Sequence, residues 1–379
     1  MEPTRSDRNP ARILFLSRRY PPSMGGIQTH CFHLYTRLKE FCPVTLIALG
    51  MDSLLHLLWF LPYAWLRAFF ALVFRRVDVV YFSDGVICCL APLLYPFASS
   101  SCRFVVTIFG LEMTYGNRAA QALMRAGARR CERITVISEN SRRLAVEWGL
   151  PADRIELIYV GVEPALPAEE TCEALRLQFQ MDYGLRFGSD QVLLNLGRQV
   201  PRKGMRAFIE NGLVHLDPAI HLVIAGSGPE VPQLRRAIEE GDAASRVLLL
   251  GRVSDEMAAM LRQHADLFIM PNVETVGDVE GYGIAPLESM YVGTPVVAFD
   301  VDALGESIRS GGYLVDAGDY PAFAARVAEH LNLYSAQKTQ MATAARDYVL
   351  REYNWELTAR RYRALFDGRA LDAYNEPEA

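Results

Sequence analysis

Short apolar segments recur along the whole chain, and few polar residues interrupt them. In the first half they occupy residues 13–17, 44–49, 77–83, 103–110, 133–138 and 154–160. In the second half they occupy residues 192–197, 221–226, 246–251, 266–271, 294–299 and 312–317. Nearly continuous apolar runs are typical of parallel strands that are covered on both faces, whereas half-exposed strands alternate. The pattern therefore predicts two sets of buried parallel strands.

Helical segments lie between these runs, for example residues 116–132 and 320–333. Alternation of strands and helices is typical of α/β doubly wound sheets, and two sets predict two domains. We place the first domain at residues 1–165 and the second at 166–354. The stretch 161–190 serves as the linker, and a single final helix is expected over 355–372.

Length and composition agree with this division. A chain of 379 residues with 51% hydrophobic residues suits a globular protein of two or three domains. The seven cysteines form no C-x-x-C pair, which favours reduced core cysteines over a disulfide or metal framework. The first twelve residues hold no apolar segment of the secretory type, so we expect a cytoplasmic protein.

Charge is distributed unevenly along the chain. Residues 1–170 hold 19 Lys and Arg against 15 Asp and Glu, whereas residues 171–379 hold 20 against 29. A basic first half indicates contact with an anionic surface. No basic stripe interleaved with aromatic residues is present, and the pI is near 5.9, which argues against nucleic acid as a partner.

One apolar segment, residues 54–74, is about long enough to span a bilayer. His56, Pro62 and Arg67 interrupt it, and an arginine near the middle of a span is costly. Two alternatives remain beside a span: a buried helix of a globular domain, and an apolar helix that lies on a membrane surface.

Two loops that follow predicted strands carry residues suited to anions. Gly25 and Gly26 open a helix expected to start near Gln28, and glycines let backbone N–H groups approach an anion at a helix N-terminus. Arg198 and Lys203 flank a Pro-containing turn and could neutralise a diphosphate leaving group. Ordinary turns with solvated charges are the alternative for both loops. The dinucleotide fingerprint G-x-G-x-x-G is absent from them, which argues against NAD.

The stretch GDVEGYGIAPLESM, residues 277–290, places Glu280 and Glu288 eight positions apart. Pro286 suits the first turn of a helix, so we expect Glu288 in that turn. A carboxylate there can accept hydrogen bonds from a ribose diol, and Glu280 can do the same for sugar hydroxyls. The alternative is a loop that leads into a helix whose first turn favours an acidic residue.

These segments, in this order and over nearly the whole chain, resemble the retaining glycosyltransferases of family 4, which have the GT-B fold. Residues 280–288 match the E-x7-E signature of that family. The other segments that carry the resemblance are GGIQTH, TVISENSRRLAVEWGLPADRIELIYVGVE, GRQVPRKG, GSGP and LGRVSDEM. The resemblance implies two Rossmann-like domains facing across a cleft, with the final helix packed back on the first domain around Trp355.

The resemblance also implies roles for individual residues. Arg198 and Lys203 would hold the donor diphosphate, Glu288 the ribose and Glu280 the donor sugar. Val253 would meet the nucleobase through its backbone. The remaining donor contacts would come from Gly25, Gly26, Gly281, Gly283 and Ile284.

The chain departs from the family pattern at Phe109, which stands where many members carry a histidine near the donor sugar. Phenylalanine can neither donate a hydrogen bond to a sugar hydroxyl nor move a proton. His30 could reach the cleft instead, but a capping or structural role for it is the alternative.

The implied function is transfer of a sugar, with retention, from a nucleotide-diphosphate sugar to a glycan or lipid-linked acceptor, without a cofactor or metal. Two alternatives remain: a non-catalytic GT-B subunit that binds a partner or membrane, and a nucleotide-sugar epimerase or hydrolase. We further expect peripheral attachment to the cytoplasmic membrane face. The residues expected to contact the membrane are Trp59, Trp65, Arg67, Phe69, Arg75 and Arg76.

Overall fold

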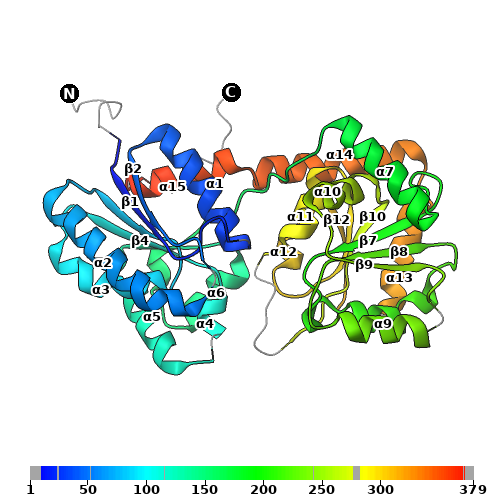
Figure 1. The fold of residues 1–379 in the computed structure, drawn as a ribbon, viewed down its shortest axis with the longest axis horizontal. Coiled ribbons are helices and arrows are strands. Elements are labelled where there is room, and N and C mark those ends of the chain that lie inside the picture. Colours follow the sequence, from blue (N-terminus) through cyan, green and yellow to red (C-terminus); the bar gives the residue numbers. More distant parts are fainter. Residues whose placement is uncertain are drawn as a thin grey trace. The chain divides into compact units, whose positions relative to one another are not determined.

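A computed structural model describes residues 10–369 and residue 371, apart from residues 24, 52, 115, 242 and 276–281. The chain divides into two compact units, each with its own sheet (Figure 1). Unit 1 comprises Met1–Gly161 and Tyr353–Ala379, and unit 2 comprises Val162–Glu352. The chain therefore returns to unit 1 after completing unit 2.

Unit 1 contains a sheet of six parallel strands in the order β2-β1-β3-β4-β5-β6. Its strands are β1 (Ile13–Ser17), β2 (Val44–Ala48), β3 (Val79–Phe82), β4 (Arg103–Ile108), β5 (Arg133–Val136) and β6 (Ile155–Leu157). Its helices are α1 (Gly26–Phe41), α2 (Leu57–Phe74), α3 (Ala91–Leu94), α4 (Leu111–Thr114), α5 (Arg118–Arg130), α6 (Glu139–Glu147) and α15 (Trp355–Phe366). Short 3-10 turns supplement them.

Unit 2 contains a second sheet of six parallel strands in the order β12-β11-β10-β7-β8-β9. Its strands are β7 (Val192–Leu196), β8 (His221–Ala225), β9 (Val247–Gly251), β10 (Leu267–Met270), β11 (Val296–Phe299) and β12 (Gly312–Val315). Its helices are α7 (Glu169–Tyr183), α8 (Met205–Asn211), α9 (Val231–Glu240), α10 (Asp255–His264), α11 (Ile284–Tyr291), α12 (Leu304–Ile308), α13 (Tyr320–Leu331) and α14 (Ser335–Glu352). Every strand of both sheets lies within a predicted apolar segment.

The apolar runs are continuous because neighbouring residues of a strand point to opposite faces of the sheet and both faces are covered. Leu14 and Leu16 of β1 pack in a cluster with residues of α2 and α5. Phe15 points to the opposite face, where its ring lies 6.1 Å from that of Tyr35 in α1. Because helices cover both faces of the sheet, both sets of side chains are removed from water.

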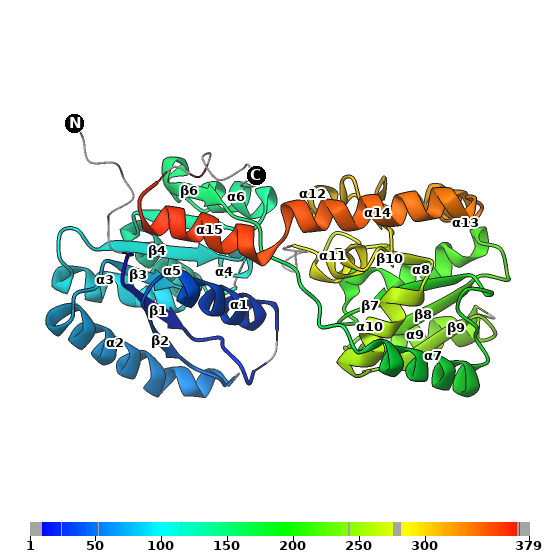
Figure 2. The same ribbon diagram turned by 90° about the horizontal axis from the view of Figure 1, so that it is seen from above.

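Helix α15 is fastened to unit 1 by a buried cluster of hydroxyl groups. The hydroxyl of Tyr362 lies 2.9 Å from that of Thr107 in β4 and 3.1 Å from that of Thr135 in β5. At the start of α15, the ring of Trp355 stacks on His33 of α1 with centroids 4.8 Å apart. Figures 1 and 2 show α15 lying beside α1. The last helix is thus part of the first unit.

Helix α2 is buried along one side only. Phe60, Ala64 and Ala68 lie in the core of unit 1, but only 22% of the helix is buried. Among the residues that the structure describes, α2 is the one helix long and apolar enough to cross a membrane by length and composition. The exposed apolar residues of α2 and their exposed fractions are Leu58 77%, Trp59 51%, Tyr63 43%, Leu66 47%, Phe70 48%, Val73 47% and Phe74 71%.

Candidate functional site

The loops at the carboxyl edge of the unit 2 sheet pack backbone against backbone. A side chain at Gly226, after β8, would collide with the carbonyl oxygen of Gly197, after β7. A side chain at Gly228 would likewise collide with the carbonyl of Gln199, whose N–H donates to Ser227 O at 3.0 Å. Only glycine fits such close approaches, so the GSGP turn lies directly against the loop that carries Arg198.

The two cations of that loop occupy different environments. Arg198 is exposed and forms no ion pair with any residue in the described part of the chain. Lys203 is only 8% exposed and ends a 3-10 turn, Pro201–Lys203. The turn is closed by Gly204 at φ 65°, where a side chain would collide with the carbonyl of Pro271 after β10. The cations therefore stand on a loop fixed against the neighbouring strand.

Glu288 lies on α11 and is paired with an arginine that the sequence analysis did not single out. The helix begins at Ile284, after Gly283 at φ 75°, so Glu288 is its fifth residue and not in the first turn as predicted. Its Oε2 accepts a hydrogen bond of 2.5 Å from Nη2 of Arg262, in the last turn of α10. Burial raises the pKa of Glu288, and the Arg262 charge opposes this rise.

The other predicted donor contacts are placed as follows. Glu280 and Gly281 lie outside the described residues. Val253 is half-buried in the loop between β9 and α10 and precedes Ser254, whose hydroxyl accepts from Met257 N at 3.2 Å and caps α10. Ile284 is half-buried at the first position of α11.

In unit 1, the two predicted glycines open α1, which starts at Gly26 rather than near Gln28. Gly25 precedes the helix at φ 153°. As the N-cap residue, Gly25 has no side chain to cap the first backbone N–H groups of α1, and no acidic residue occupies the first turn. Helix starts of this kind can bind anions.

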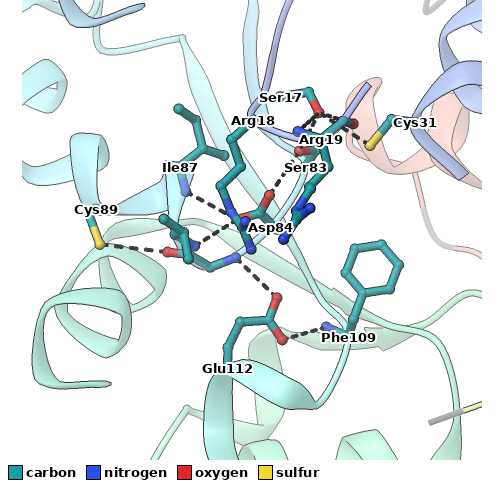
Figure 3. Close-up of polar contacts among 12 residues, drawn as sticks. Ser17, Arg18, Arg19, Cys31, Ser83, Asp84, Ile87, Cys89, Phe109 and Glu112 are labelled. Atoms are coloured by element: carbon teal, nitrogen blue, oxygen red, sulfur yellow. Dashed lines mark hydrogen bonds and ion pairs between the residues drawn. The ribbon is translucent and has the colours of Figure 1, made fainter. Parts of the chain in front are cut away.

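The loops after β1, β3 and β4 are joined by buried charges (Figure 3). Arg18 Nε donates to Asp84 Oδ1 at 3.0 Å, and Asp84 accepts from the N–H of Val86 at 2.8 Å. Glu112 accepts from the N–H groups of Phe109 at 3.2 Å and Gly110 at 3.1 Å. Burial raises the pKa of Glu112, and the charge of Asp84 adds to this. The cluster fixes the backbone around Phe109.

Phe109 is 8% exposed, and its ring meets that of His30 edge to face at 5.3 Å. His30 is 1% exposed, and its Nε2 lies 3.4 Å from the hydroxyl of Tyr81. Burial lowers the pKa of His30 to about 3. The histidine therefore has the structural position that the sequence analysis left as its alternative.

Comparison with known proteins places the chain in a family. Residues 24–166 match the family described as Glycosyltransferase Family 4, and residues 180–348 match Glycosyl transferases group 1. A GDP-mannose-dependent alpha-(1-6)-phosphatidylinositol monomannoside mannosyltransferase of Mycolicibacterium smegmatis is 31% identical over 279 residues, 70% of each chain. The chain belongs to glycosyltransferase family 4.

Other relatives match over shorter stretches. A phosphatidyl-myo-inositol mannosyltransferase of Mycobacterium leprae is 34% identical over 174 residues, 45% of this chain and 44% of the relative. The amylovoran biosynthesis glycosyltransferase AmsK of Erwinia amylovora is 29% identical over 234 residues, 60% of this chain and 54% of the relative. The chain spans about half the length of these curated relatives.

Solved structures share the GT-B fold of the family. Anabaena HepE in complex with UDP and glucose superposes with a TM-score of 0.71 at 18% identity, covering 94% of this chain and 100% of that one. Sucrose-phosphate synthase from Thermosynechococcus elongatus gives 0.71 at 19% identity, with the same coverage. At such identities the likeness concerns the fold alone.

The sequence did not single out several polar residues that the structure places in buried contacts of the two units. They are Arg18, Asp84 and Glu112 in unit 1, and Gln199 and Arg262 in unit 2. Asp84 and Glu112 each follow a predicted strand, which is a usable signal. Arg262 sits inside a helix, and no local pattern distinguishes it from a solvated charge.

Proposed function

We propose that the protein is a retaining glycosyltransferase that moves a sugar from a nucleotide-diphosphate sugar to an acceptor. The observation that carries the proposal is the placement of Arg198, Lys203 and Glu288 on elements that follow the neighbouring strands β7 and β10. Glycines hold the backbone of these loops in close contact. Ligands of doubly wound sheets bind at this edge.

In this proposal the donor nucleotide lies along the unit 2 edge. The backbone at Val253 meets the base, and Glu288 accepts hydrogen bonds from the ribose. Arg198 and Lys203 hold the diphosphate, and Glu280 holds hydroxyls of the sugar. Backbone N–H groups of Gly281, Gly283 and Ile284 supply the remaining unit 2 contacts. From unit 1, backbone N–H groups of Gly25 and Gly26 at the start of α1 are proposed as further phosphate contacts.

The proposed reaction is a front-face substitution with an oxocarbenium-like transition state. The bond from the anomeric carbon to the diphosphate breaks, and negative charge builds on the leaving oxygen. Arg198 and Lys203 stabilise that charge, and loss of one such contact costs on the order of 3 kcal/mol of barrier. The leaving phosphate accepts the proton of the acceptor hydroxyl, so no histidine is required at Phe109. Two cations fill the role that a metal would have.

We further propose a lipid-linked acceptor reached at the cytoplasmic membrane face. Two of the similar proteins are named for phosphatidylinositol acceptors. On this chain, α2 exposes a continuous apolar row, and residues 53–77 contain no acidic residue but include Arg67, Arg75 and Arg76. An apolar helix face bordered by arginines suits a surface of anionic lipids.

The predicted membrane contacts divide into two groups. Trp59, Arg67, Arg75 and Arg76 are exposed. Trp65 and Phe69 are half-buried, since both rings pack against Phe97, at 6.5 and 4.8 Å between centroids. The contact surface that we propose therefore consists of the exposed row of α2. Trp65 and Phe69 pack between this row and the rest of unit 1.

The donor is tested by thermal denaturation of the full chain with a panel of nucleoside diphosphates and their sugars. A ligand at one hundred times its Kd stabilises by about 2.7 kcal/mol. The stabilising donor is then incubated with lipid-linked acceptors, and the anomeric configuration of the product is determined by NMR. Retention is expected. Consumption of the donor without any acceptor would favour an epimerase or hydrolase, and absence of any stabilising nucleotide would exclude a donor-binding enzyme.

A further inference from the structure

The Arg262–Glu288 pair joins α10 and α11, two helices of unit 2 that are neighbours in space. Nη2 of Arg262 donates to Oε2 of Glu288 at 2.5 Å, and their side chains are 10% and 25% exposed. No other hydrogen bond reaches the Glu288 carboxylate from the residues that the structure describes. Since a carboxylate offers about four lone-pair sites, Oε1 remains available to a ligand.

Arg262 is itself held in place. Its backbone carbonyl accepts a hydrogen bond from the hydroxyl of Thr294, which is 4% exposed and precedes β11. Its Nε is buried and has no acceptor within the described part of the chain. The guanidinium therefore makes one contact with Glu288, not the two-point pair that arginine often forms with a carboxylate. A one-point contact fixes one carboxylate oxygen and leaves the other without a hydrogen bond from the arginine.

We infer that Arg262 is a positioning residue for the nucleotide, because it orients Glu288 so that Oε1 accepts a hydrogen bond from the donor ribose. This inference rests on the proposed function, in which Glu288 binds the ribose. Without Arg262 the buried carboxylate loses its compensating charge and its fixed rotamer. The consequence is a selective loss of affinity for the ribose diol, with contacts to the diphosphate retained.

The test compares two ligands on the full chain by isothermal titration calorimetry. The first is the nucleoside diphosphate that stabilises the protein most, and the second is its 2′,3′-dideoxy counterpart. The ratio of their Kd values measures recognition of the ribose, and we expect about tenfold or more for the wild type. Glu288→Gln and Arg262→Gln should both reduce the ratio of the two Kd values to within about twofold of one. Arg262→Lys should retain about half of the logarithm of the wild-type ratio.

Arg246 provides a matched control in the same unit. Its guanidinium donates to the carbonyls of Leu213 at 2.9 Å and Asp217 at 3.2 Å and forms no hydrogen bond or ion pair with Glu288. Arg246→Gln should leave the ratio at the wild-type value. If Arg262→Gln does not fold, the test rests on Arg262→Lys, whose ratio must fall at least about threefold below that of the wild type.

The outcomes separate the inference from the proposed function. An Arg262→Gln protein that binds both ligands more weakly but keeps the wild-type ratio would overturn the inference and leave the proposed function standing. If the wild type does not discriminate between the ligands, Glu288 does not recognise the ribose, and the inference is wrong. A wild type that binds no nucleoside diphosphate would contradict the proposed function itself.

Discussion

The ring of Phe109 meets the ring of His30 edge to face, with centroids 5.3 Å apart. Phe109 follows β4, where the resemblance to family 4 led us to expect a histidine, and its ring makes a buried aromatic contact. His30 supplies an imidazole beside it, yet burial lowers the pKa of that imidazole to about 3. The chain thus has a histidine near the position, but one held neutral in the core of unit 1.

The first prediction concerns the pH dependence of stability. The folded pKa of His30, about 3, lies below the unfolded value of about 6.5, so the unfolded chain binds the proton first. His30 therefore contributes fully above pH 6.5, and its contribution is lost as the pH falls toward 3. We expect a loss of about 2 kcal/mol between pH 6.5 and pH 5. Urea unfolding followed by tryptophan fluorescence reports unit 1, which contains all four tryptophans.

His30→Gln is the matched variant, because glutamine has no charge to gain over this range. In this variant the free energy of unfolding should depend less on pH, because the contribution of His30 is absent. This holds whatever the absolute stability of the variant is. His330, whose pKa burial lowers to about 4, lies in unit 2 and remains in both proteins. Equal slopes for the two proteins in the fluorescence signal would show that His30 is not buried as described.

The second prediction concerns Phe109. Because its side chain is 8% exposed, Phe109→Ala should destabilise unit 1 by about 3 kcal/mol, and Phe109→Leu by much less. Phe109→His should also destabilise, since it buries an imidazole beside His30, and should not raise the rate of sugar transfer. Urea unfolding and a transfer assay on the same preparations decide this. A faster enzyme of unchanged stability would mean that the ring faces the sugar.

How much the sequence could predict depends on how local each signal is. Every strand was predicted because burial on both faces produces a run of apolar residues that is visible locally. The environment of α2 could not be predicted in this way. Leu58 and Phe60 are both apolar, yet one is 77% exposed and the other buried, and only the neighbouring elements decide which. The Arg262–Glu288 pair spans 26 positions between two helices and leaves no periodic pattern.

The third prediction concerns the docking of α15. Tyr362→Phe removes a hydroxyl that lies within 2.9 Å of Thr107 and 3.1 Å of Thr135, all three residues being buried. We expect a loss of about 1–2 kcal/mol, because buried hydroxyls lose a partner. Replacing the Thr135 hydroxyl as well, in Tyr362→Phe/Thr135→Val, should cost less than the sum of the two single changes. Additive losses in urea unfolding would argue against a shared network.

The fourth prediction concerns the two cations after β7. Arg198→Ala and Lys203→Ala should each lower kcat a few hundredfold, as expected for about 3 kcal/mol of lost charge stabilisation. Arg206→Ala, which removes an exposed arginine of α8, is the control and should leave kcat unchanged.

A related prediction is that sugar transfer persists in EDTA. Chelation is a demanding test, because Asp300 and Asp302 form an Asp-x-Asp pair after β11, a spacing that suits a metal. Complete loss of activity, restored by manganese or magnesium, would contradict the proposed mechanism.

The last prediction concerns the exposed row of α2. Leu58, Phe70 and Phe74 are 77%, 48% and 71% exposed, and each would transfer its apolar surface from water to lipid on binding. Since a fully buried side chain of this size contributes about 1.5–3 kcal/mol, replacing all three by glutamine should weaken partitioning into vesicles at least about 100-fold. The control is Met181→Gln/Tyr334→Gln, which removes two apolar residues of unit 2 that are 73% and 81% exposed.

Flotation with vesicles of phosphatidylcholine and phosphatidylglycerol measures this partitioning. The wild type and the unit 2 control should float, and the triple glutamine variant should remain with the soluble fraction. The variant Arg67→Glu/Arg75→Glu/Arg76→Glu should also float less than the wild type. The difference between the two proteins should shrink at high salt, where the charges are screened. If the wild type does not float at low salt, α2 is not a lipid-binding surface. The acceptor would then have to reach the enzyme from solution, and a soluble glycan would replace the lipid-linked acceptor in the proposal.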